Sequence, residues 1–274
     1  MTMHGKLKDK VALITGAGSG IGKATAQLFA SESATVIVSD ASLHAAQKVA
    51  QVISQDGSSA EAVQLDVTSE ETWNSVMNEI VDRHGKLDVL VNNAGISKSK
   101  HISEMAFDEW RSVMAVNLDG VFLGTKSALH VMANSGGGSI VNVASVSGIT
   151  PSAGASNYSA SKSAVRLFSK TAAIECADAR TGVRVNIVTP GGVKTPMWEK
   201  EPFFQSLTEQ HGGTEAAFAA ISNGTPSQEF FTPEEVARTI MYLASDDSSH
   251  LTGVEIVLDR RPPSKLRLRE DFSN

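Results

Sequence analysis

The chain has 274 residues, 41% hydrophobic and 20% charged, and its 30 acidic against 24 basic residues give a net charge of −6. This length suits one α/β domain, and a mildly acidic chain without a polybasic footprint is not expected to bind nucleic acid. The single cysteine, the lack of an N-terminal apolar segment and the lack of a run of ~18 apolar residues argue against disulfides, secretion and a membrane span, so we expect a cytoplasmic protein.

Short β-branched runs alternate with longer helical patterns along the chain. The runs predict seven strands, at residues 11–15, 35–39, 62–65, 87–91, 139–143, 182–188 and 254–258. Helical patterns lie between them, at 21–31, 43–55, after a Thr-Ser-Glu-Glu cap at 68–71, at 107–134, around Tyr158 and at 233–244. Continuous apolar strands with helices between them predict an α/β fold with a parallel sheet covered on both faces.

Residues 195–232 form the only long stretch without clear periodicity. All eight prolines lie after residue 150, and several fall in this stretch. Long irregular segments in compact domains are usually functional lids or disordered. We therefore predict a single domain over 1–274 that carries a substrate lid at 195–232.

A glycine-rich turn follows the first predicted strand. Glycines there let the backbone approach a pyrophosphate at the start of a helix, although they also serve ordinary tight turns. Ile21 stands where the usual dinucleotide fingerprint has its third glycine, and Ala17 and Ala24 exclude a P-loop. The predicted contacts to the cofactor are Gly16, Ser19, Gly20, Ile21 and Gly22.

Asp40 ends the second predicted strand. A carboxylate at this point can accept hydrogen bonds from a ribose 2′-OH and would repel a 2′-phosphate, although it could also cap a helix. The nearest following cation in sequence is Lys48. We therefore expect NAD in preference to NADP.

Tyr158 and Lys162 are four residues apart and share a helix face after the fifth predicted strand. A phenol with a pKa near ~10 is a poor base at neutral pH, and a nearby ammonium is expected to lower that pKa. Such a pair is common by chance. Its place at the carboxyl ends of parallel strands, where ligands bind, is what favours a catalytic role.

Together with the segments 15–22, 92–95 and 190–191, these residues resemble the short-chain dehydrogenase/reductase family over roughly residues 7–257. The resemblance implies a three-layer, doubly wound Rossmann fold with a seven-stranded parallel sheet, and a homo-oligomer, either tetramer or dimer. It implies that Tyr158 is the proton donor or acceptor, that Lys162 holds the nicotinamide ribose and that Ser145 binds the substrate oxygen. Ser147 is the second choice for that serine, and Asn117, within the long helix, would hold a proton-relaying water.

The resemblance also implies further cofactor contacts. The cofactor contacts are Asp66, Val67, Asn93, Ala94, Gly95, Pro190, Gly191, Val193 and Thr195. Apart from the resemblance, the apolar residues of the segment 195–232 could build a lid over a bulky substrate, unless they serve packing or subunit contacts; they are Met197, Trp198, Phe203, Phe204, Phe218, Phe230 and Phe231. No HExxH motif or His/Cys pair predicts a metal.

Residues 259–274 depart from the family, because Arg260 and Arg261 stand where many relatives have two glycines. We expect a solvated or disordered tail rather than a membrane-binding one. The expected activity is hydride transfer between NAD and a secondary alcohol or ketone, with a cyclic alcohol such as a hydroxysteroid as substrate. The alternatives are a 3-oxoacyl-carrier reductase and an inactive dinucleotide-binding regulator.

Overall fold

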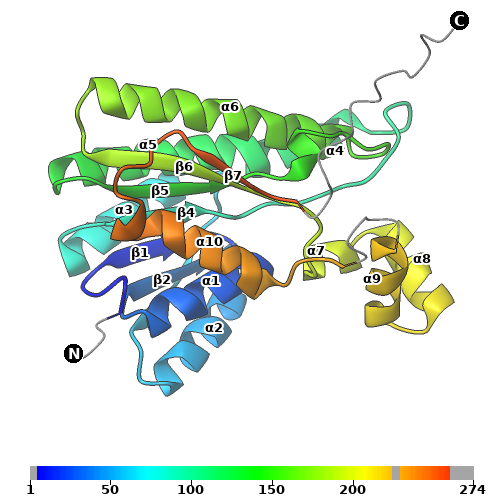
Figure 1. The fold of residues 1–274 in the computed structure, drawn as a ribbon, viewed down its shortest axis with the longest axis horizontal. Coiled ribbons are helices and arrows are strands. Elements are labelled where there is room, and N and C mark those ends of the chain that lie inside the picture. The colour runs from blue at the N-terminus through cyan, green and yellow to red at the C-terminus, as the bar shows by residue number, and fades with distance from the viewer. Residues whose placement is uncertain (1–4, 224–228, 260–274) are drawn as a thin grey trace, which may run out of the picture.

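The computed structural model describes residues 5–223 and 229–259, and its centre is a parallel sheet of seven strands (Figure 1). The strand order is β3-β2-β1-β4-β5-β6-β7, with crossovers that fit a doubly wound sheet. The strands are β1 (Val11–Ile14), β2 (Thr35–Asp40), β3 (Ala60–Gln64), β4 (Val89–Asn92), β5 (Gly138–Val143), β6 (Val183–Pro190) and β7 (Glu255–Leu258). The predicted fold class and all seven strands are confirmed, with ends that differ by at most two residues.

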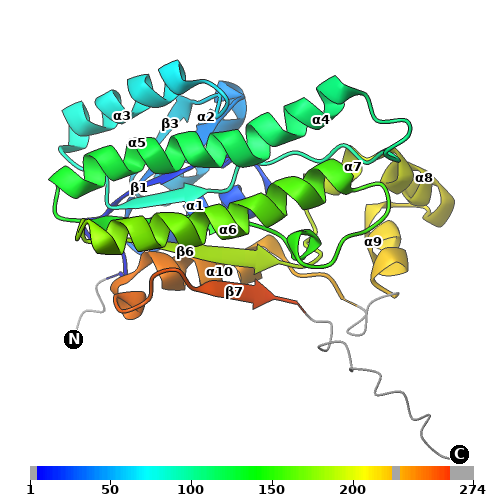
Figure 2. The same ribbon diagram turned by 90° about the horizontal axis from the view of Figure 1, so that it is seen from above.

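Helices cover both faces of the sheet (Figures 1 and 2). One layer holds α1 (Gly20–Ser31), α2 (Leu43–Gln55) and α10 (Pro233–Ala244). The other holds α3 (Glu70–His84), α4 (Phe107–Met114), α5 (Gly120–Asn134) and α6 (Ser156–Asp178). Figure 2 shows α5 and α6 side by side over the sheet. Among the described residues, none of the helices combines the length and apolarity needed to cross a membrane.

Two apolar cores follow from the alternation of side chains along each strand. In β1, Ala12 and Ile14 pack into the core beneath α1, α2 and α10, whereas Val11 and Leu13 pack into the core beneath α3, α5 and α6. Cys176 is buried in the second core, as the sequence predicted, and burial raises the pKa of its thiol.

Local signals explain where several helices begin and end. The hydroxyls of Ser42 and Ser69 accept hydrogen bonds from the first turns of α2 and α3. Thr232 and Glu235 form a capping box at the start of α10. Gly85 ends α3 in the left-handed conformation.

The chain is helical over the whole of 107–134, as the sequence predicted, but a π-helical segment, Ala115–Asp119, joins α4 to α5. One expectation about helices is wrong. The segment 195–232 is not irregular over most of its length, since it contains α7 (Pro196–Glu199), α8 (Pro202–His211) and α9 (Thr214–Ser222). These helices are short, and Pro and Gly residues bound them, so their periodicity is hard to detect. The predicted tail at 259–274 lies outside the described residues apart from Asp259.

Candidate functional site

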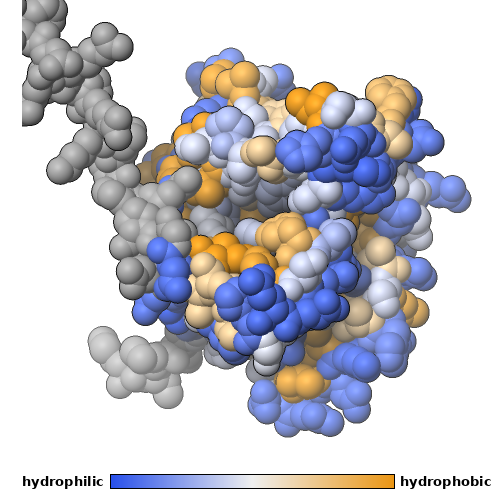
Figure 3. Space-filling model, turned by 90° about the vertical axis from the view of Figure 1, so that its right-hand side faces the viewer, coloured by the Kyte–Doolittle hydropathy of each residue, from blue (hydrophilic) through white to orange (hydrophobic). Residues whose placement is uncertain are grey.

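The carboxyl ends of the strands and the lid helices α7, α8 and α9 lie at the same end of the molecule (Figure 1). Figure 3 looks onto this end and shows a hollow with apolar groups among hydrophilic ones. Ser145 follows β5, and Tyr158 and Lys162 lie in the first two turns of α6. The sheet therefore brings the predicted catalytic side chains to its ligand-binding edge.

The Ser145 hydroxyl lies beside the Tyr158 phenol and acts to lower the pKa of that phenol. Ser145 is buried, and its Oγ accepts a hydrogen bond of 3.1 Å from the main-chain N–H of Ser147. The sequence left Ser145 and Ser147 as alternatives for the serine that binds the substrate oxygen, and the structure gives them different roles. The Ser145 hydroxyl lies beside the phenol, whereas Ser147 orients that hydroxyl through its backbone.

Lys162 is buried at 3% exposure, and its Nζ donates a hydrogen bond of 2.8 Å to the carbonyl of Val143. Burial lowers the pKa of Lys162 from 10.5 to about 8, so the ammonium still prevails at neutral pH. Its Nζ lies 5.8 Å from the centroid of the Tyr158 ring.

The expected lowering of the Tyr158 pKa is wrong for the protein alone. Burial raises the pKa of the phenol, and the hydrogen bond with Ser145 offsets only part of that effect. Lys162 donates to the Val143 carbonyl, which directs its ammonium toward the backbone of β5. The phenol is therefore neutral at pH 7 and can serve as a proton donor.

Asn117 lies fully buried in the π-helical segment. Its amide holds the main chain of Ile96, accepting from N–H at 2.8 Å and donating to C=O at 2.9 Å, and it also donates to Ser161. A Cβ built on Gly95 would lie 3.4 Å from Asn117 Oδ1 and 3.5 Å from Lys162 Nζ. Asn117, Gly95 and Lys162 are therefore neighbours.

The glycine-rich turn leads into α1 with main-chain N–H groups available for an anion. Among the described residues, α1 has no acidic side chain in its first turn, and the Ser19 hydroxyl does not cap it. Gly16 has φ +62°, and a Cβ there would lie 2.9 Å from Ala94 Cα, so only glycine fits without strain. Asn93 fixes the turn by donating to the carbonyls of Thr15 and Gly16.

Asp40 lies beside this turn at the end of β2. Its Oδ2 accepts a hydrogen bond of 3.1 Å from the N–H of Gly18, and its Oδ1 accepts one of 2.9 Å from that of Ser42. Ser42, not Asp40, supplies the side-chain cap of α2. The carboxylate is half-buried and keeps capacity for a further donor.

The loop after β6, which holds several of the predicted cofactor contacts, reaches the same turn through Thr195. A Cβ on Gly20 would lie 3.3 Å from Cγ2 of Thr195, so the loop after β6 contacts the start of α1. In that loop Val193 pairs with Phe231, and the N–H of Gly191 donates to the carbonyl of Leu258. The positive-φ turn, the available N–H groups and the Asp40 carboxylate together fit a dinucleotide.

Asp66 and Val67 lie after β3, on the other side of β1. Asp66 is exposed, and its Oδ1 accepts hydrogen bonds from the N–H and the hydroxyl of Thr68. Val67 is buried against Gly120, where a Cβ would lie 2.8 Å from Val67 Cγ2. This packing limits how far the turn after β3 can move relative to α5.

The lid has a small aromatic core of its own. Phe204, Phe218 and Phe230 are buried against one another, with ring centroids of Phe204 and Phe218 4.7 Å apart. These three residues therefore pack against one another within the lid, which is the alternative to covering a substrate. Trp198 is partly buried on this core and donates to the carbonyl of Val193, Met197 is half-buried, and Phe203 is exposed.

Three further residues near the carboxyl ends of the strands were not predicted from the sequence. Glu201 is buried in the lid and accepts from the N–H of Ser99, while Asn157 donates to the carbonyl of Lys98. Arg166 on α6 joins Glu255 of β7 to the turn after Ser145. Only Arg166 carries a sequence signal, because it is four residues beyond Lys162 on the same helix face.

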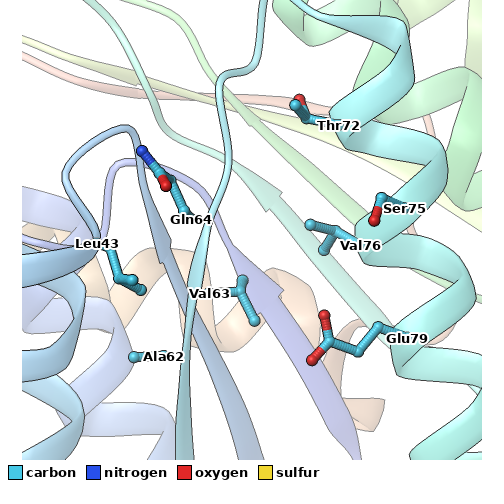
Figure 4. A pocket seen from close by; sticks show the side chains of 8 residues that line it. All are labelled: Leu43, Ala62, Val63, Gln64, Thr72, Ser75, Val76 and Glu79. Atoms are coloured by element: carbon cyan, nitrogen blue, oxygen red, sulfur yellow. The ribbon is translucent and has the colours of Figure 1, made fainter.

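A separate shallow pocket opens at the outer edge of the sheet (Figure 4). It lies between β3 and α3, whereas Ser145 follows β5 on the opposite side of β1. Its lining mixes apolar and polar side chains, namely Leu43, Ala62, Val63, Gln64, Thr72, Ser75, Val76 and Glu79. The pocket contains none of the predicted site residues.

Comparison with known proteins assigns the family. The model of the short chain dehydrogenase family matches residues 10–204. The 3-oxoacyl-(acyl-carrier-protein) reductase FabG of Thermotoga maritima is 42% identical over 93% of this chain and 98% of its own length. The NADP-dependent (R)-specific alcohol dehydrogenase of Lentilactobacillus kefiri is 38% identical over 94% and 98%. The cyclohexanol dehydrogenase of an Acinetobacter species is 38% identical over 96% and 98%.

A solved structure agrees. A short-chain type dehydrogenase/reductase from Mycobacterium marinum superposes with a TM-score of 0.83 at 34% identity, covering 92% of this chain and 95% of its own. The sheet order, the site geometry and the match over residues 10–204 lead to one conclusion. The chain belongs to the short-chain dehydrogenase family of oxidoreductases, which bind nicotinamide dinucleotides.

Proposed function

We propose that the protein transfers hydride between NAD and a secondary alcohol or ketone, with Ser145, Tyr158, Lys162 and Asn117 as its site. The observation that carries this proposal is the neighbouring Ser145 hydroxyl and Tyr158 phenol, with a buried ammonium, at the carboxyl ends of the strands. The bound nicotinamide supplies the hydride acceptor or donor. The presence of Ser145, Tyr158 and Lys162 together also argues against an inactive regulatory protein.

Tyr158 moves the proton in this proposal. Its neutral phenol donates a proton to the oxygen of a ketone and becomes a phenolate, and in the reverse direction the phenolate takes the proton of an alcohol. Ser145 would hold that oxygen, because its Oγ accepts from Ser147 and its one hydrogen, which stabilises the Tyr158 phenolate in the protein alone, can be donated to the substrate oxygen instead. The buried Lys162 ammonium stabilises negative charge as it develops near Tyr158.

NAD is the proposed cofactor because of Asp40. The carboxylate is held at the end of β2 by two main-chain N–H groups, where it can accept from a ribose 2′-OH and repel a 2′-phosphate. The Lentilactobacillus relative is NADP-dependent by name, so the two cofactors must be compared directly.

A cyclic secondary alcohol is the proposed substrate class. The partly buried Met197 and Trp198 present apolar surface in the lid, and one relative is a cyclohexanol dehydrogenase. A hydroxysteroid belongs to the same class. The 42% identity to FabG favours a second candidate, the reduction of a 3-oxoacyl thioester.

A substrate and cofactor panel tests both candidates. Purified protein would be assayed with NAD⁺ and NADP⁺ on cyclohexanol, an acyclic secondary alcohol and a hydroxysteroid, and in reverse on an acetoacetyl thioester. The proposal expects NAD⁺ reduction with a cyclic alcohol. Turnover of the thioester with NADPH alone would establish the second candidate, and equal use of NADP⁺ would refute the role of Asp40.

A further inference from the structure

Three side chains along one face of α6 contact the end of β5 and the turn after it at three points. Tyr158, Lys162 and Arg166 follow one another at intervals of four residues. The Tyr158 phenol lies beside the Ser145 hydroxyl, which acts to lower the pKa of the phenol, and Lys162 Nζ donates to the carbonyl of Val143 at 2.8 Å. An Arg166 terminal nitrogen donates to the carbonyl of Gly148 at 2.8 Å.

The third contact holds a tight turn against the helix. Val146–Gly148 forms a single 3-10 turn, and Ser145, immediately before it, has its Oγ bonded to the N–H of Ser147. A Cβ on Gly148 would lie 2.7 Å from the N of Ser163, so the turn packs directly on the backbone of α6. A shift of this turn would therefore move Ser145 relative to Tyr158.

Glu255 anchors Arg166 from the last strand. Its carboxylate, 9% exposed, accepts two hydrogen bonds from the Arg166 guanidinium, with Oε2 at 3.0 Å, and it also accepts from Thr189 at 2.8 Å and Lys170 at 3.2 Å. Burial opposes its charge, but these donors lower the pKa of Glu255 to about 2. The carboxylate is thus ionised at every pH at which the enzyme would work.

The connection spans both walls of the site. Thr189 is in β6 and precedes Pro190 and Gly191, whose loop is a proposed cofactor contact. Arg166 reaches the turn after Ser145 on the other side. Since the guanidinium fork is planar and rigid, the bidentate pair with Glu255 fixes where its remaining nitrogen points.

We propose that Arg166, oriented by Glu255, is a positioning residue that sets the Ser145 hydroxyl against the Tyr158 phenol. This inference rests on the proposed function for its effect on turnover. It has a second consequence that needs neither substrate nor cofactor. Displacing Ser145 removes a hydrogen bond to the Tyr158 phenolate, and the pKa of Tyr158 rises.

Lys170 provides the matched control. It donates to the same carboxylate as Arg166, and no contact between Lys170 and the turn after Ser145 is found among the described residues. Arg166→Gln and Lys170→Gln each remove one cation from Glu255, but only the first releases Gly148. Arg166→Lys keeps the charge and loses the bidentate fork, so it tests geometry apart from electrostatics.

The experiment has two readouts. On the panel alcohol, Arg166→Gln and Arg166→Lys should lower kcat by roughly 10- to 100-fold, because a displacement near 1 Å can reduce a rate by ~100-fold. The KM for NAD⁺ should change by less than about twofold, and Lys170→Gln should retain kcat within about twofold. Ultraviolet titration of tyrosinate is the second readout. The chain has only two tyrosines, so Tyr242→Phe leaves Tyr158 as the sole reporter.

In the Tyr242→Phe background, both Arg166 variants should titrate at higher pH than the parent, and Lys170→Gln should not. If Arg166→Gln fails to fold, Arg166→Lys decides the question. Unchanged kcat and titration in the folded Arg166 variants, or equal changes in Lys170→Gln, would overturn the positioning role. If the parent turns over no alcohol, the proposed function fails, while the titration still reports on the placement of Ser145.

Discussion

Replacing Lys162 by methionine should abolish catalysis while stabilising the fold at neutral pH. Burial lowers the pKa of Lys162 from 10.5 to about 8, a difference of about 2.5 units. At ~1.36 kcal/mol per unit, holding the ammonium in the folded chain at pH 7 costs about 3 kcal/mol relative to a neutral side chain. Methionine has a similar volume and carries no charge.

One contact acts in the opposite direction. Lys162 Nζ donates to the carbonyl of Val143, and leaving a buried carbonyl without its donor costs ~1–2 kcal/mol. The net expectation is that Lys162→Met raises the free energy of unfolding by ~1–2 kcal/mol at pH 7. Between about pH 8 and 10.5 the unfolded parent binds the proton and the folded parent does not, so the parent's stability rises with pH. The advantage of the variant should therefore vanish or reverse near pH 10.

Urea unfolding at pH 7 and at about pH 10 measures both effects. The slope of the free energy against urea should be unchanged, which would show that the two proteins expose the same surface. Lys126→Met is the control, because Lys126 is exposed in an ion pair with Glu70 and its loss should change stability by less than ~1 kcal/mol at either pH. A loss of stability in Lys162→Met at pH 7, or a stability difference that does not depend on pH, would show that the Lys162 ammonium is not destabilising in the folded protein.

Three further substitutions separate cofactor choice, turn geometry and helix capping. Asp40→Ser should lower kcat/KM for NAD⁺ by roughly 10- to 100-fold, since a hydrogen bond to a charged group contributes ~1.5–3 kcal/mol, and should raise kcat/KM for NADP⁺. Steady-state kinetics with both cofactors measures this preference, and an unchanged ratio of the two kcat/KM values would contradict the role of Asp40. Gly16→Ala should weaken NADH binding, measured by fluorescence titration, and lower the free energy of unfolding by ~1–2 kcal/mol. The reason is that φ is +62° at this residue and the new Cβ would clash with Ala94. An NADH affinity equal to the parent's would contradict this prediction. Ser69→Ala should lower the free energy of unfolding by ~1 kcal/mol through loss of the α3 cap, with kcat unchanged, and a change in kcat would count against a purely local role.

Local patterns were sufficient for the strands and for most helices. β1 and β6 are runs of buried, mostly apolar residues, and Ser42, Ser69 and Thr232 cap helices at positions that turn chemistry predicts. Pattern was not sufficient where tertiary contacts decide. The π-helical segment at Asn117 depends on an amide that binds Ile96, a residue 21 positions away.

In the site, too, some features follow from the sequence pattern and others depend on tertiary contacts. The sequence placed Ser145, Tyr158 and Lys162 at one edge of the sheet, because strand order in a parallel fold brings them there. The predicted lowering of the Tyr158 pKa was wrong for the protein alone. Burial of the phenol and the orientation of the Lys162 ammonium decide that pKa, and both depend on tertiary packing. No sequence pattern indicated the pair between Arg166 and Glu255, which are 89 positions apart.

The central claim is that the Tyr158 phenol transfers the proton at an NAD-dependent alcohol dehydrogenase site. The most direct measurement compares Tyr158→Phe with Tyr242→Phe, in turnover of a cyclic alcohol with NAD⁺ and in NADH binding. Both variants should bind NADH with nearly the parent's affinity. Turnover should fall by at least ~100-fold in Tyr158→Phe alone, in keeping with the usual contribution of a general acid or base. Turnover retained in Tyr158→Phe would show that Tyr158 is not the proton donor or acceptor.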